Sequence, residues 1–266
     1  MPLRTDDDRE LKRDDDGEEQ EELQGHMSFL DHLEELRSRI IRMLIAVAIG
    51  FAACFYFADT IFAIVVRPIV QNIPADAKLV ATTAMEGFNL EIKLSILASI
   101  FLTAPFLMAQ VWLFISPGLY KREKRYALPF IVSSSLLFIT GGLFGYFFAF
   151  PYAINYLAHY NEAMHLTGMY KASDYFDLFL PVELGLGIIF EIPALIFVLS
   201  RLGLVTGGFL LRNTKYAILI SAVVAAIITP TGDAINMTVI AVPMIGLYML
   251  GVVVAYVFGK KRKKDD

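Results

Sequence analysis

The chain has 266 residues, of which 56% are hydrophobic and 19% are charged, and its mean hydropathy is +0.58. This apolar content exceeds that of soluble domains, and the formal net charge of −4 gives no reason to expect a nucleic-acid partner. The composition therefore predicts an all-α integral membrane protein.

The first segment is acidic and polar. Residues 1–26 contain too few apolar side chains to build a core and are predicted to form a disordered tail. Ser28 and Asp31 have the spacing of a capping box, which predicts a helix that begins at about Phe29.

Runs of about 18 apolar residues can cross a hydrocarbon core of ~30 Å. Five such runs are present, at residues 40–57, 90–115, 127–150, 178–199 and 237–258. A run at 216–228 is fifth in order, and as a straight helix it is too short to cross unaided. The pattern predicts a six-span membrane domain over residues 27–259, with kinked helices, and a charged tail over 260–266.

Cations gather in alternate loops. They precede the first run, follow the second and fourth, and end the chain: Arg37, Arg39, Lys121, Arg122, Lys124, Arg125, Arg201, Arg212, Lys215 and Lys260 to Lys264. The positive-inside rule then places both termini in the cytoplasm, as in a multi-pass protein of the cytoplasmic (inner) membrane.

Glu35 lies beside an apolar stripe that leads into the first run. His32 and Arg39 stand three residues before it and four residues after it. One interpretation is an ordinary i, i+4 pair with Arg39, and the other is an acidic site for a foreign cation.

Glu123 is the only acid in a loop with four cations, so its neighbours alone could neutralise it. It is nevertheless predicted to lie on the same membrane face as Glu35. Two carboxylates there could bind two guanidinium groups, which have the planar fork for bidentate contacts. Because the loop is net positive, such an attraction has to act at short range.

Glu191 falls within an apolar run, where a carboxylate costs about 3 kcal/mol on insertion scales unless it is neutral, paired or hydrated. Pro193 predicts a bend beside it. Glu183, in the same run, is expected at the interface. Gly141 and Gly145 form a GxxxG pattern that favours packing within the chain over dimerisation by about two to one.

Catalytic motifs such as HExxH, GxSxG or a phosphate-binding glycine loop do not occur in the sequence, and no His, Cys or carboxylate cluster has metal-ligand spacing. We therefore expect a protein that is not an enzyme and that carries no metal or cofactor.

Five motifs carry a resemblance to a known family. They are HLEELRSRI before the first run, EGF at 86–88, QVWLFISPGLYKREKRY from 110 on, FEIP at 190–193, and ITPTGD with the later AVP in 228–243. In this order, from about Met27 to Phe258, they resemble the TatC family, the multi-spanning receptor subunit of the twin-arginine protein translocase.

The resemblance implies a glove-like fold with a concave face. It implies binding of the twin-arginine signal peptides of folded proteins, at a site formed by Glu35, Glu123, Phe114, Leu36 and Arg37. It also implies assembly into an oligomer with TatA-like and TatB-like single-span subunits for export driven by the proton motive force. Membrane-embedded partner contacts fall at Glu191, Asp233 and Thr229, and outer-loop positions at Pro68 and Glu86.

Two alternatives remain open. A proton-coupled six-span solute carrier would use Glu191, but no internal repeat is evident and Glu35 and Glu123 would have no role. A purely structural scaffold would leave all three glutamates replaceable.

Overall fold

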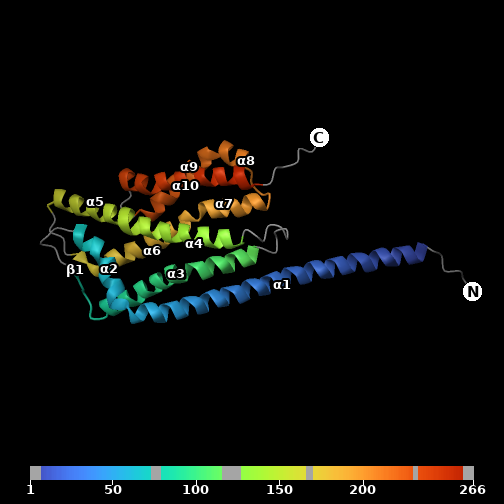
Figure 1. Ribbon diagram of the computed structural model, residues 1–266, viewed down its shortest axis with the longest axis horizontal. Coiled ribbons are helices and arrows are strands. Elements are labelled where there is room, and N and C mark those ends of the chain that lie inside the picture. The colour runs from blue at the N-terminus through green and yellow to red at the C-terminus, as the bar shows by residue number, and fades with distance from the viewer. Residues whose placement is uncertain (1–6, 73–78, 116–126, 166–169, 230–232, 260–266) are drawn as a thin grey trace, which may run out of the picture. The chain divides into compact units, whose positions relative to one another are not determined.

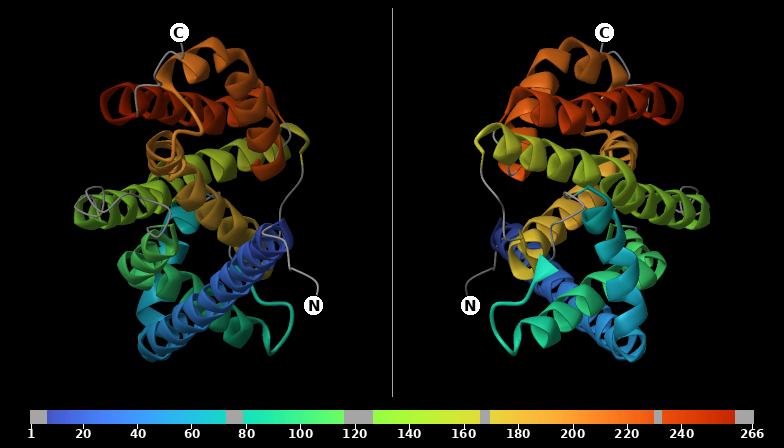
Figure 2. Two further views of the ribbon diagram at one scale, coloured as in Figure 1. Left: turned by 90° about the vertical axis from the view of Figure 1, so that its right-hand side faces the viewer. Right: turned by 90° about the vertical axis from the view of Figure 1, so that its left-hand side faces the viewer.

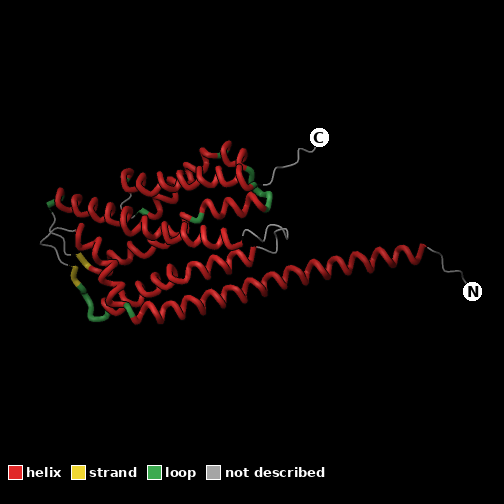
Figure 3. Tube along the Cα trace, viewed as in Figure 1, coloured by secondary structure: helices red, strands yellow, loops and turns green. Residues whose placement is uncertain are grey.

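The computed structural model describes residues 7–72, 79–115, 127–165, 170–229 and 233–259, with side chains from His32 onward. The described chain is almost entirely helical (Figure 3). It divides into two compact units, residues 1–45 and 46–266, and each is considered by itself.

The first helix, α1, runs from Asp7 to Tyr56, and its apolar part is His32–Tyr56. The predicted start at Phe29 is therefore wrong, because α1 begins at Asp7. The physical reason is that Glu, Lys, Arg, Leu and Gln lose little side-chain freedom in a helix. A composition that excludes a compact core does not exclude a helix.

Four further stretches are long and apolar enough to cross a membrane. They are α3 (Glu86–Ile115); α4 (Ala127–Phe144), the π-helical turn η3 (Gly145–Ala149) and α5 (Phe150–Ala163) in succession; α6 (Ala172–Phe190) followed by α7 (Ile192–Arg201); and α10 (Ala234–Phe258). Helix α9 (Thr214–Ile228) is shorter, as predicted. The predicted five long apolar helices are confirmed, although the third continues beyond residue 150 to Ala163.

The segment formed by α6 and α7 is central in the second unit. In its most apolar stretch, 56% of the residues are buried inside the protein. Helix α4 packs against both α6 and α3, and α10 packs against α7 and α9 (Figures 1 and 2). At the α4–α6 crossing, a Cβ on Gly141 would lie 2.6 Å from the Leu186 carbonyl oxygen. The predicted internal packing of the GxxxG pattern is confirmed, because only glycine permits this approach.

The two ends of this unit differ. Strands β1 (Leu79–Val80) and β2 (Tyr170–Lys171) form a short parallel pair at one end, where α5 contacts α2 (Ala58–Asn72) (Figure 1). The other end carries α8 (Gly207–Arg212) and the last turns of α10. We call these two ends the strand end and the α8 end.

Candidate functional site

Glu35 is bound by a guanidinium group in the structure. The Arg39 Nε atom donates to Glu35 Oε1 at 3.1 Å, and Arg39 Nη2 donates to the same oxygen. His32 Nδ1 lies 3.9 Å from Oε2. The Glu35 side chain keeps 32% of its surface exposed, so the local pair forms without closing the carboxylate off from solvent.

Of the other residues predicted to bind the signal peptide, the structure describes Leu36, Arg37 and Phe114. Glu123 lies outside the described residues. Leu36 is half-buried and Arg37 is exposed on α1. Phe114 is half-buried in the last turn of α3, within the other unit.

Glu191 caps the break between α6 and α7. Its backbone is helical, but the helix is interrupted there and resumes at Ile192 with Pro193 in its first turn, so the predicted bend is confirmed. The Ser134 hydroxyl of α4 donates to Glu191 Oε2. Glu191 Oε1 is buried and has no hydrogen-bond partner among the described residues. Half of this carboxyl group is therefore available for a donor.

Asp233 and Thr229 have local structural roles where α9 ends and α10 begins. Asp233 is the N-cap of α10 and accepts from the Ile235 and Asn236 amides at 3.0 and 2.8 Å, and from Asn236 Nδ2 at 2.8 Å. The buried Thr229 hydroxyl donates to the Ala225 carbonyl at 2.6 Å. Both side chains thus define how α9 ends and α10 begins.

Pro68 and Glu86 belong to the strand end. Pro68 is buried inside α2, and its carbonyl accepts from Asn72 Nδ2 at 2.8 Å. Glu86 begins α3 and is only 5% exposed. Its Oε2 accepts from the Thr82 amide at 2.6 Å and from the Thr82 hydroxyl at 3.0 Å, while its Oε1 accepts from the Ser173 amide at 2.9 Å. Glu86 therefore ties the start of α3 to the start of α6.

Glu183 is a buried acidic residue that the sequence analysis did not predict to be buried. The expectation that it lies at the interface is wrong: the residue is 3% exposed, and Oε1 has no hydrogen-bond partner in the described part of the chain. It borders a cavity of about 240 Å³ between α2, α3, α4 and α6. The sequence feature that indicates burial is the position of Glu183 in its helix. At 1.5 Å per residue it lies about 16 Å from the start of α6, well inside the span.

The carboxyl group of Glu183 fits because Gly145 faces it. A Cβ at Gly145 would lie 2.7 Å from Glu183 Oε1 and 2.9 Å from Oε2. Gly145 is also the first residue of the π-helical turn η3, a local widening that is common at functional sites. The fold thus makes space for a carboxyl group inside the membrane-spanning part.

Three aromatic side chains, from α3, α4 and α7, lie next to one another near the α8 end. Trp112 of α3 stacks near Phe130 of α4 with ring centroids 4.7 Å apart, and Phe130 lies 6.2 Å from Phe197 of α7. Trp112 is 2% exposed and belongs to the core.

These features define a polytopic helical membrane protein with carboxylates at a helix break and beside its first span. Comparison with known proteins specifies the class. The family described as Sec-independent protein translocase protein (TatC) matches residues 31–243, most of the chain. The chain belongs to the TatC family.

Individual relatives agree with this assignment. The TatC protein of Koribacter versatilis is 47% identical over 92% of this chain and 90% of its own length, and that of Escherichia coli K12 is 35% identical over 89% and 92%. A crystal structure of the twin arginine translocase receptor TatC is 33% identical, with a TM-score of 0.72 over 84% of this chain and 97% of that one. These matches support a role in the translocase rather than the solute-carrier alternative.

Proposed function

We propose that this chain is the receptor and core subunit of a twin-arginine translocase. It crosses the cytoplasmic membrane six times, with both termini inside, and α9 is the short fifth span. The alternation of basic loops supports this orientation. The solved relative with 33% identity is itself named a twin arginine translocase receptor.

The observation that carries the proposal is the contact between Glu35 and Arg39. Two nitrogens of one guanidinium group already bond the Glu35 carboxylate, which stays partly exposed. A signal-peptide arginine can replace Arg39 in this arrangement. Each charge-assisted hydrogen bond gained is worth about 1.5–3 kcal/mol.

Glu123 supplies the second carboxylate in this proposal. The paired arginines of the peptide each contact one glutamate, while Leu36 and Phe114 contact the apolar part of the signal. Arg37, exposed on α1, borders the site and disfavours a peptide whose basic pair is out of register. The net-positive loop around Glu123 makes recognition depend on close geometry instead of long-range attraction.

Single-span TatA-like and TatB-like subunits are the proposed membrane partners, in an oligomer that uses the proton motive force. Glu191 is the proposed contact, since its buried Oε1 has no partner among the described residues and can accept from a polar side chain. The proposed contributions of Asp233 and Thr229 are indirect: they hold the α9–α10 turn in shape.

Binding of a fluorescent twin-arginine peptide to the protein in native membranes tests the receptor proposal. Glu35→Gln should weaken binding roughly 10-fold to 100-fold, since about 1.4 kcal/mol corresponds to a factor of ten. Glu34→Gln is the matched control, because Glu34 is an exposed neighbour on the same helix. A Lys-Lys peptide should also bind more weakly. Equal losses in both variants, or no loss in either, would overturn the proposal.

A further inference from the structure

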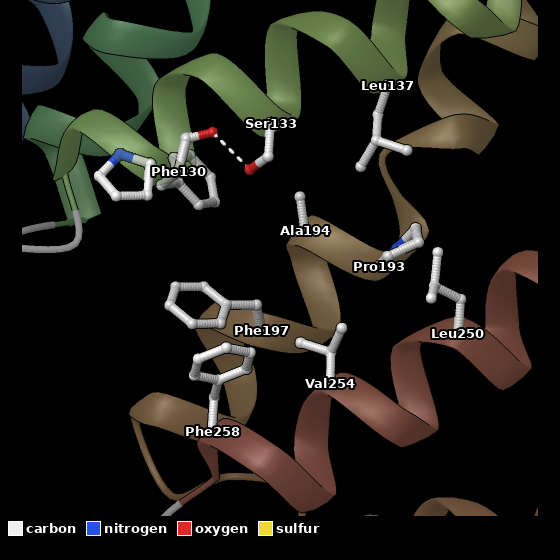
Figure 4. Close-up of a pocket in the computed structure, with 10 residues that line it drawn as sticks. Phe130, Ser133, Leu137, Pro193, Ala194, Phe197, Leu250, Val254 and Phe258 are labelled. Atoms are coloured by element: carbon white, nitrogen blue, oxygen red, sulfur yellow. Dashed lines mark hydrogen bonds between the residues drawn. The ribbon is translucent and has the colours of Figure 1, made fainter.

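A groove lies open on the surface of the second unit between α4, α7 and α10. Its volume is about 320 Å³, and its walls include Pro129, Leu137, Pro193, Leu250 and Val254 (Figure 4). Ser133 is the one hydroxyl side chain among the described residues that line it. That hydroxyl donates to the Phe130 carbonyl within its own helix at 3.1 Å, so the groove offers an apolar surface.

The groove faces outward from spans that cross the membrane. Leu250 is 48% exposed, and Pro129 and Ser133 are also exposed. The small side chain of Ala194 and the ring of Pro193, at the start of α7, leave the space that a longer side chain would fill. Within a bilayer, hydrocarbon is the medium that this opening meets.

A cation stands at the α8 end of the groove. The Arg201 guanidinium carbon lies 5.7 Å from the centroid of the Phe197 ring and 6.0 Å from that of Phe258. Both rings line the groove and lie 5.8 Å apart (Figure 4). The positively charged guanidinium group of Arg201 therefore lies directly beside two of the aromatic rings that line the apolar groove.

We propose that this groove binds one anionic phospholipid, with an acyl chain between α4, α7 and α10 and the phosphate at Arg201. Guanidinium groups bond phosphate oxygens in a bidentate manner. Residues 192–229 contain Arg201, Arg212 and Lys215 and no Asp or Glu, so this segment of the chain has a positive charge that complements an anion. In the proposed topology the site faces the inner leaflet.

The dimensions of the groove suit a lipid chain. A single flexible acyl chain enters such a space without displacing α7 or α10.

The test is native mass spectrometry of the purified full chain, after delipidation and addition of equal concentrations of dioleoyl phosphatidylglycerol or dioleoyl phosphatidylcholine. The wild type should retain one phosphatidylglycerol, at least several-fold more than phosphatidylcholine. Arg201→Gln should bring this ratio near one, whereas Arg212→Gln, at an exposed cation of α8, should preserve it.

Val254→Trp should fill the groove and reduce retention of both lipids. Val253→Trp is its control, because Val253 is the adjacent residue on α10, is 57% exposed and does not line the groove. Equal retention of the two lipids by the wild type would overturn the proposal, and that comparison needs no variant. Equal effects of the paired variants would also overturn it, since these would show only general charge or surface effects.

Discussion

The Ser134 hydroxyl of α4 donates a hydrogen bond to Glu191 at the break between α6 and α7. The contact joins two spans at the point where the central helix loses its regular backbone pattern. The bond goes to Glu191 Oε2, and Oε1 has no hydrogen-bond partner in the described residues, so this contact is the main compensation for burying the carboxyl group.

Replacement of Ser134 by alanine is expected to lower the free energy of unfolding by about 1–3 kcal/mol, because it leaves a buried carboxyl group unsatisfied. Thermal unfolding in mild detergent measures the effect. Ser133→Ala, which removes only a hydroxyl bonded within α4, should change stability much less. The double variant Ser134→Ala with Glu191→Leu should recover most of the loss, and failure to recover would argue against this account.

Gly145→Ala is expected to destabilise the protein by about 1–3 kcal/mol through overpacking against Glu183. Adding Glu183→Ala should relieve the clash, so that the double variant is more stable than the sum of the single effects predicts. Gly246→Ala, inside α10 with no atom within 4 Å of an added Cβ, should instead stabilise by about 0.5–1 kcal/mol. Strict additivity between positions 145 and 183 would contradict the proposed contact.

Glu86→Ala should loosen the strand end, because the Ser173 and Thr82 amides lose their acceptor. Hydrogen exchange at these two amides should accelerate, while exchange in the centre of α6 stays unchanged. Glu91→Ala, five residues further along α3 and only half-buried, serves as the control. Unaltered exchange at Ser173 in Glu86→Ala would show that the hydrogen bond has no role in holding the two helices together.

Arg39→Gln should free the Glu35 carboxylate from its guanidinium partner and strengthen binding of a twin-arginine peptide several-fold. The gain should shrink as salt concentration rises, since the competing contacts are partly exposed ion pairs. Titration of the fluorescent peptide at low and high salt measures both effects. Weaker binding in Arg39→Gln would mean that Arg39 orients Glu35 for the peptide rather than competing with it.

The sequence determined that the chain is helical and membrane-spanning, because the length and apolarity of each run are local properties. It also predicted the bend at Pro193 and the close helix approach at Gly141, which follow from backbone chemistry at single residues. The N-terminal helix shows the limit of this logic: composition excluded a core in residues 7–26, but it left helix formation open.

Only the tertiary structure decided what each polar residue contacts. Glu183 and Glu191 lie in one apolar run, and only the structure shows that Glu183 faces Gly145 and Glu191 faces Ser134. The physical reason is that apolar runs specify burial in lipid or in protein equally well, and the choice depends on which neighbouring helix covers each face.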